Sequence, residues 1–281
     1  MPITRHVLGL SGGRDSAALA VFMRENYPEL DIEYFFTDTG KELPEVYEFL
    51  GRLEGFLGKE IARLNSQRDF DFWFQEYGTF LPSPRTRWCT KQLKIRPFEA
   101  WIAPTLKSGD EVVSYVAIRA DEDRQGYVAT DIRLTVKFPL VEHGIDKAGV
   151  IQLLNDVGLG LPDYYQWRSR SGCTFCFYQQ KIEWVRLMRQ HPDAFEEAKS
   201  YEKTAVDSGS PYTWVQGESL EELSRSERVA EIEVDFERRI EFEKKKRRRH
   251  PLLDDGLEIE LEIDELYGVE EGGGACLACH K

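Results

Sequence analysis

The segment from Ser11 to Ser16 has the composition of a loop that binds phosphate. It reads Ser-Gly-Gly-Arg-Asp-Ser and lies between two apolar runs, residues 6–10 and 17–23. Glycines let backbone N–H groups approach phosphate oxygens, and the N-terminus of a following helix adds a partial positive charge. The Walker and dinucleotide-binding fingerprints require other spacings. The loop therefore predicts an anion site, although a Gly-Gly turn with Asp15 or Ser16 capping a helix fits the same residues.

Five cysteines form the second group of residues with chemical potential. Cys173 and Cys176 make one Cys-x-x-Cys unit, Cys276 and Cys279 make another, and Cys89 stands alone. In a reducing compartment such spacing favours metal or redox chemistry over structural disulfides. Two such pairs could form a four-cysteine zinc site, and four thiolates also suit a [4Fe-4S] cluster. Spacing alone does not select the metal, and a bare thiol pair stays open.

Alternating strands and helices would position both groups. Strands are expected at 6–10, 31–36, 61–64, 111–118 and 133–140, with helices at 16–24, 44–57 and 91–101. This alternation predicts an α/β unit with a central parallel sheet, whose ligands bind beyond the carboxyl ends of the strands. We expect this unit at 1–165, the Cys-x-x-Cys segment with a helical appendage at 166–250, and an acidic, mobile tail with the terminal Cys-x-x-Cys at 251–281.

Composition limits the class of protein. The chain has 281 residues, 41% of them hydrophobic, and a net charge of -13. These values exclude global disorder and a polyanion-coating role. Because no apolar run is long enough to span a bilayer and no signal peptide is evident, we expect a cytoplasmic protein with no membrane partner. The six cations of Lys244 to Arg249 would be a solvated helix end or a local contact for DNA or RNA.

Five ordered segments resemble the PP-loop ATP pyrophosphatase superfamily, specifically its sulfonucleotide (PAPS) reductase, CysH-like and DndC-like group. The first is the loop at Ser11 to Ser16. The later segments are Asp38 to Glu45, Arg87 to Lys94, Ile118 to Arg124, and Phe138 to Leu140 followed by Gly172 to Cys176. The resemblance covers roughly residues 5–190, and Ala117 stands where the family usually has glycine.

The resemblance implies a Rossmann-like adenine nucleotide α-hydrolase fold with a central, mostly parallel sheet and a C-terminal helical appendage. It places the phosphates of ATP, or the sulfate of a sulfonucleotide such as PAPS or APS, with Mg²⁺ against the loop. The nucleotide-binding residues it implies are Ser11, Gly12, Gly13, Arg14, Asp15, Ser16, Asp38, Thr39 and Gly40. Asp15, Arg119 and Arg124 would act in catalysis, although the arginines could equally form surface salt bridges. Lys91 and Lys94, three residues apart, are expected to face solvent.

The same resemblance implies that Cys89, Cys173 and Cys176 hold a [4Fe-4S] cluster, with zinc as the alternative. Reductases of the family use a tail cysteine as nucleophile, which makes Cys279 a candidate catalytic thiol. The match departs from cluster-bearing relatives at Trp88, where they have a second cysteine.

The function that follows is ATP-dependent adenylylation of a substrate, with pyrophosphate release, for sulfur transfer. The acceptor could be a nucleic acid bound through Lys244 to Arg249, and a cysteine desulfurase could donate the sulfur. The alternatives are a phosphoadenylyl- or adenylyl-sulfate reductase, and a CysH-like nucleotide-binding subunit of a CRISPR or DNA-modification defence system.

Overall fold

The computed structural model describes residues 3–65, 67–123, 131–248 and 266. Within this part of the chain, five strands form one sheet in the order β3-β2-β1-β4-β5, and every pair is parallel. The strands are β1 (Thr4–Leu10), β2 (Ile32–Thr37), β3 (Ile61–Leu64), β4 (Glu111–Tyr115) and β5 (Leu134–Lys137). The expected α/β class with a parallel central sheet is confirmed.

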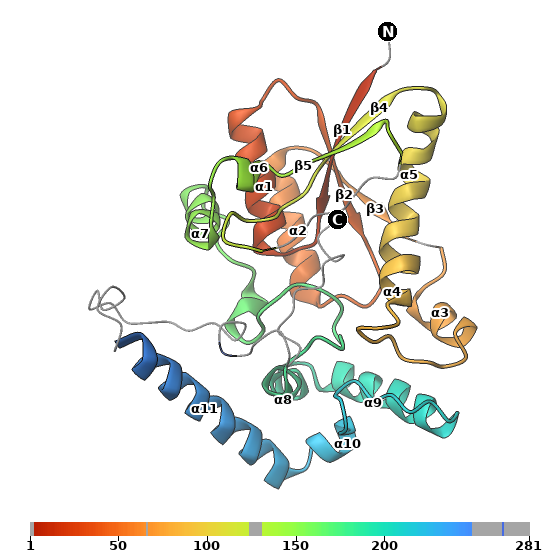
Figure 1. The fold of residues 1–281 in the computed structure, drawn as a ribbon, viewed down its shortest axis with the longest axis vertical. Coiled ribbons are helices and arrows are strands. Elements are labelled where there is room, and N and C mark those ends of the chain that lie inside the picture. The colour runs from red at the N-terminus through yellow and green to blue at the C-terminus, as the bar shows by residue number, and fades with distance from the viewer. Residues whose placement is uncertain (1–2, 66, 124–130, 249–265, 267–281) are drawn as a thin grey trace.

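Helices cover both faces of the sheet (Figure 1). One face carries α1 (Arg14–Asn26), α2 (Pro44–Leu57) and α7 (Lys147–Asp156). On the other face, α5 (Arg96–Lys107) packs Phe98 and Ile102 against Val7, Phe35 and Val112 of the strands. Because both faces are covered, the inner strand β2 exposes only one of its six residues.

The remaining helices connect these layers or follow them. They are α3 (Phe70–Glu76), α4 (Trp88–Thr90), a π-helical turn η1 (Lys91–Ile95), α6 (Pro139–Glu142), a 3-10 turn η2 (Asp163–Gln166), α8 (Lys181–Gln190), α9 (Pro192–Asp207), α10 (Leu220–Leu223) and α11 (Ser226–Arg248). The strand expected at 133–140 ends at Lys137, because Pro139 is suited to the first turn of a helix and begins α6.

The C-terminal helices lie beyond the carboxyl ends of the strands (Figure 1). Helix α8 packs against α9 and α11, and its fully buried Trp184 lies near Phe195 and Trp214. Leu266 also packs against the main hydrophobic cluster. The rest of the segment expected to be a mobile tail lies outside the described residues. In the described ranges, no helix combines the length and apolarity needed to cross a bilayer.

Sheet topology fixes where a ligand can bind. Starting from β1, the chain adds β2 and β3 on one side of the sheet and then β4 and β5 on the other side. The strand order therefore reverses between β1 and β4. In open parallel sheets, ligands bind in the crevice outside the carboxyl ends of the strands at such a point. The segments that follow β1 and β4 contain the Ser11 to Ser16 loop and Arg119.

Candidate functional site

Two glycines shape the loop between β1 and α1. Gly12 has a φ of 72°, and a Cβ atom there would lie 2.5 Å from Cγ1 of Val46 on α2. A Cβ on Gly13 would lie 2.7 Å from the hydroxyl oxygen of Ser171. Such distances are too short for real atoms, so the loop can lie against α2 and the 171 segment only with glycine at both positions.

Hydroxyl groups fix the loop to the first turn of α1. The N–H of Ser11 donates to Oγ of Ser16 at 3.1 Å, and that hydroxyl donates to the carbonyl oxygen of Gly13 at 3.2 Å. Helix α1 has Gly13 as its N-cap, and no side chain of the described residues caps it. The reading in which Asp15 or Ser16 caps the helix therefore does not hold. An uncapped helix N-terminus keeps its donors directed toward a bound anion.

A cluster of charged side chains lies around Asp15 at the start of α1. Asp15 is 7% exposed, and Nη1 of Arg119 lies 3.2 Å from each of its carboxylate oxygens. Arg119 also bonds to Asp121 at 2.9 Å and lies 3.6 Å from Glu122. Burial opposes the charge of Arg119, but these carboxylates outweigh it and raise its pKa. Arg119 therefore holds its charge beside the loop.

Arg14 and Tyr165 complete this end of the site. Arg14 is 2% exposed, and its guanidinium lies over the Tyr165 ring, 4.8 Å from the centroid. Burial raises the pKa of Tyr165 to about 12, so its hydroxyl keeps a proton at neutral pH. The Arg14 N–H donates to this hydroxyl at 3.3 Å. The phenol proton is then available to an oxygen of a bound ligand.

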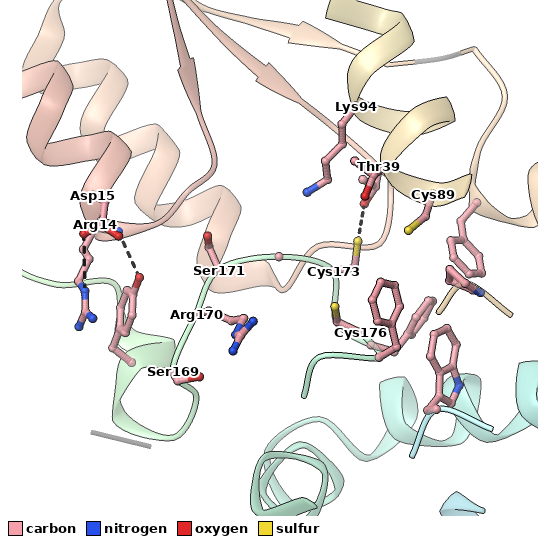
Figure 2. Close-up of a pocket in the computed structure, with 18 of the residues that line it drawn as sticks. Arg14, Asp15, Thr39, Cys89, Lys94, Ser169, Arg170, Ser171, Cys173 and Cys176 are labelled. Carbon is pink, nitrogen blue, oxygen red and sulfur yellow. Dashed lines mark hydrogen bonds and ion pairs between the residues drawn. The ribbon is translucent and has the colours of Figure 1, made fainter. Parts of the chain in front are cut away.

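These groups line one wall of a pocket, and the cysteines line another (Figure 2). Arg14 and Asp15 lie at one end, whereas Cys89, Cys173 and Cys176 gather at the other, near Lys94 and Thr39. The segment from Ser169 to Cys173 runs between the two ends. Also lining the pocket are Phe70, Pro82, Thr90, Arg119, Glu122, Tyr165, Phe175, Phe177 and Trp214.

Backbone contacts anchor Cys173 beside the end of β2. Cys173 forms an antiparallel bridge with Glu42, and the N–H of Thr174 donates to the carbonyl of Lys41 at 2.6 Å. The Cys173 Sγ lies 3.4 Å from Oγ1 of Thr39. Arg168, 1% exposed, donates from Nη2 to the Cys173 carbonyl oxygen at 2.8 Å. The segment after β2 and the buried Arg168 therefore fix this thiol in the pocket.

Burial favours the protonated form of two of the thiols, Cys89 and Cys173. Burial raises the pKa of Cys89 to about 11, with a further contribution from Cys176, and burial also raises the pKa of Cys173. Among the described residues, no group of three or more His, Cys, Asp and Glu side chains lies close enough together to hold a metal ion. A bound metal cation would deprotonate its thiol ligands and reverse the direction of these shifts.

Lys94 and Glu42 place opposite charges beside the thiols. Glu42 is 7% exposed and accepts hydrogen bonds from Thr39 at 2.9 Å and from the Cys173 thiol at 3.9 Å. Burial raises the pKa of Glu42, and Lys94 opposes this rise. Burial disfavours the charge on Lys94, but Glu42 and the cysteines outweigh it and raise its pKa. The thiol end of the pocket therefore contains a cation able to face an anionic ligand.

The structure brings seven of the predicted site residues together. Arg14, Asp15, Thr39, Arg119 and the three cysteines line one pocket. Ser11, Gly12, Gly13 and Ser16 do not line it but shape the adjoining turn. Asp38 and Gly40 do not line it either, because the Asp38 carboxylate instead accepts from the Gly40 N–H and from Tyr47, both at 2.8 Å. Arg124, Cys276 and Cys279 lie outside the described residues.

Sequence reasoning missed several pocket residues. Lys91 is exposed as expected, but the expectation that Lys94 faces solvent is wrong, because Lys94 lines the pocket. The π-helical turn over Lys91–Ile95 is wider than an α-helical turn, so it separates the two lysines around the helix axis. Glu122 lies in the Ile118 to Arg124 segment that carries the family resemblance, but it was given no role. Tyr165 and the Ser169 to Ser171 segment were not identified; the only signal was that the segment lies just before the Cys-x-x-Cys unit.

Comparison with known proteins gives one family match and several similar solved structures. Residues 5–134 match the sequence model of the phosphoadenosine phosphosulfate reductase domain. Similar solved structures include the phosphoadenylyl-sulfate (PAPS) reductase from Candida auris in a phosphate complex, which is 12% identical, covers 62% of this chain and 82% of its own, and has a TM-score of 0.47. Another is the U34-tRNA thiolase NcsA from Methanococcus maripaludis with its [4Fe-4S] cluster, which is 15% identical, covers 72% of this chain and 71% of its own, and has a TM-score of 0.40. No curated protein matches the chain.

The family match includes the glycine loop, the Asp38 segment, Cys89 and Arg119. It thus covers the segments that follow β1, β2 and β4, which bring Arg14, Asp15, Thr39 and Arg119 to the pocket. Over residues 5–134 the chain therefore resembles the phosphoadenosine phosphosulfate reductase domain family.

Proposed function

We propose that the protein is an ATP-dependent enzyme that adenylylates a substrate, releases pyrophosphate and transfers sulfur to the activated substrate. The observation that carries the proposal is that one pocket has an anion-binding end at Arg14 and Asp15 and a thiol end at Cys89, Cys173 and Cys176. A nucleotide activated at the first end is thereby placed beside sulfur chemistry at the second.

The nucleotide end supplies binding and charge compensation. The N-terminus of α1 and the Arg119 guanidinium would face the phosphates of ATP, and Mg²⁺ would bridge the phosphate oxygens. An acceptor oxygen attacks the α-phosphorus, and the bond from that phosphorus to the oxygen bridging to the β-phosphate breaks. Pyrophosphate leaves with that electron pair. Asp15 keeps Arg119 oriented toward this developing charge through its two 3.2 Å contacts.

The thiol end fits a soft metal group by the chemistry of its donors. Cys89, Cys173 and Cys176 would hold a [4Fe-4S] cluster, with zinc as the alternative, because thiolates are the ligands of both. When bound, the cluster would supply an iron not ligated by these cysteines, able to carry sulfide. The three thiols must lose their protons on binding, and Lys94 stabilises the resulting negative charge.

Sulfur transfer completes the reaction. Sulfide, supplied by a donor such as a cysteine desulfurase, attacks the acceptor atom bonded to the adenylylated oxygen. The bond between that atom and the oxygen breaks, and AMP leaves with the oxygen and the electron pair. The described cysteines are free thiols, which suits the reducing cytoplasm that we propose as the compartment.

The experiment is a product assay with ATP, Mg²⁺, sulfide and candidate acceptors under anaerobic conditions. The proposal predicts pyrophosphate and AMP in equal amounts. Release of orthophosphate alone would contradict it, and reduction of a sulfonucleotide without ATP consumption would identify a reductase instead. ATP binding with no turnover in the presence of every sulfur donor and acceptor would favour a nucleotide-binding subunit.

A further inference from the structure

A second cavity adjoins the site. It is a groove with a volume of about 1100 Å³, walled by residues 82–85, 177–181 and 211–217 and by one face of α11. We call it the aromatic groove. Pro82, Phe177 and Trp214 line both this groove and the cysteine pocket, so the two cavities adjoin at these residues. The proposed nucleotide and thiol chemistry does not use this groove.

Aromatic rings along the groove are held in place by other side chains. The Tyr178 ring lies 4.5 Å from that of Phe177, and the guanidinium groups of Arg87 and Arg170 lie 5.8 and 5.7 Å from its centroid. Tyr212 is 39% exposed and packs edge to face on Phe80 at 4.7 Å. Rings fixed in this way are suited to stacking on flat ligand groups.

Helix α11 extends the wall of the groove toward its own basic end. Arg228, Ile232, Asp235 and Arg239 line the groove at alternating spacings of four and three residues, which places them on one helix face. The same face continues to Phe242, 68% exposed, and to Lys246, whose side chain is 69% exposed. Lys246 follows Arg228 by five full turns of 3.6 residues. One track thus combines aromatic rings with cations.

The charge along this track is opposite to that of the whole protein. The lining carries Arg85, Lys181, Arg228 and Arg239 against Glu231 and Asp235, whereas the chain has a net charge of -13. Glu218 binds Lys181 at 2.7 Å and also Arg228, Asp235 binds Arg239 at 2.8 Å, and Glu243 lies 3.6 Å from Lys246, so these four cations are partly compensated. Arg85 is exposed at one side of the groove, and Lys244 to Lys246 are exposed at the end of α11.

We propose that the aromatic groove and the basic end of α11 bind a single-stranded nucleic acid, one base of which is directed toward the cysteine pocket. Exposed rings can stack only on bases that are not already stacked in a duplex, and spaced cations suit a phosphate backbone. The claim that the groove binds nucleic acid is independent of the proposed function. The claim that a base is directed toward the thiols rests on the proposed function, and it identifies that base as the acceptor of the sulfur.

The test is fluorescence anisotropy with labelled oligonucleotides of about 12 residues, oligo(dT) and oligo(U), and a duplex of the same length. Wild type is expected to bind the single strands more tightly than the duplex, and the DNA and RNA arms identify which strand is preferred. The variant Tyr178→Leu/Tyr212→Leu keeps apolar bulk but removes the rings, and about tenfold weaker binding is expected. Phe72→Leu, outside the groove, should bind as wild type does.

Charge variants test the backbone contacts. Arg85→Gln/Lys246→Gln should weaken binding and reduce the slope of log K against log salt by about 1.4, because each phosphate contact to a single strand contributes about 0.7. Lys107→Gln/Lys203→Gln makes the same change in net charge at exposed sites on α5 and α9 and should leave the slope unchanged. ATP binding measured on every variant verifies that the protein is folded.

Two results would overturn the groove proposal: equal affinity of the groove variants and their controls, or binding of an acidic peptide of glutamates as tight as that of the oligonucleotides. Both leave the proposed function intact. Conversely, absence of pyrophosphate release with intact oligonucleotide binding contradicts the proposed function and leaves the groove as a nucleic-acid site.

Discussion

Ser171 donates a hydrogen bond to the hydroxyl of Ser11 across 3.3 Å. This contact joins the phosphate loop after β1 to the segment that carries Cys173, although the two serines are 160 residues apart. The same Ser171 side chain occupies the space that a Cβ on Gly13 would need. The nucleotide end and the thiol end of the pocket are therefore mechanically connected, and a change in the loop is expected to reach the cysteines.

Replacing Asp15 and Ser16 by alanine should weaken binding of ATP with Mg²⁺ by at least about tenfold, or 1.4 kcal/mol. The change removes the carboxylate that orients Arg119 and the hydroxyl that ties Ser11 to Gly13. Isothermal titration calorimetry measures the affinity. The matched control is Asp207→Ala/Ser208→Ala, the same pair of residues exposed at the end of α9. Equal affinities in the two variants would refute the phosphate-loop assignment.

Iron content should depend on the pocket cysteines and not on the tail. Protein purified without oxygen should be brown, and Cys276→Ser/Cys279→Ser should keep its iron and acid-labile sulfide, whereas Cys173→Ser should lose both. The reason is that Cys89, Cys173 and Cys176 line one pocket and Cys173 is fixed there by backbone contacts.

Two outcomes of that measurement would count against this assignment. Colourless protein with stoichiometric zinc would rule out the cluster and leave a zinc site. Loss of iron in the tail variant would show that a tail cysteine is a ligand. If the tail variant keeps its iron and also full activity, a mechanism with Cys279 as nucleophile is eliminated.

Alkylation of the metal-free protein should show an unusual pH dependence. Only thiolates react, and burial raises the pKa of Cys89 to about 11. In the folded protein the rate at Cys89 should therefore keep rising about tenfold per pH unit through pH 9.5, whereas in urea it should level off near pH 8.5. Peptide mass spectrometry after iodoacetamide treatment gives the rate. A folded-state plateau near pH 8.5 would mean that Cys89 is not buried as described.

The sequence permitted the framework of the site to be predicted, because the framework depends on local patterns. Helix α2 and strand β3 begin and end where apolar spacing and Pro44 place them. The roles of Tyr165 and Ser171 could not be foreseen, since both reach the site through segments that follow the last strand of the sheet. Lys94 was misplaced because a π-helical turn cannot be distinguished from an α-helix by residue spacing.

The central claim is that nucleotide and thiols share one pocket, and protection of the cysteines by ATP tests it most directly. Alkylation of Cys173 and Cys176 in metal-free protein is measured with and without saturating ATP and Mg²⁺, in wild type and in Asp15→Ala/Ser16→Ala. The shared pocket predicts that ATP slows alkylation by about tenfold in wild type and has little effect in the variant at the same ATP concentration. Unchanged alkylation in wild type to which calorimetry shows ATP bound would contradict it.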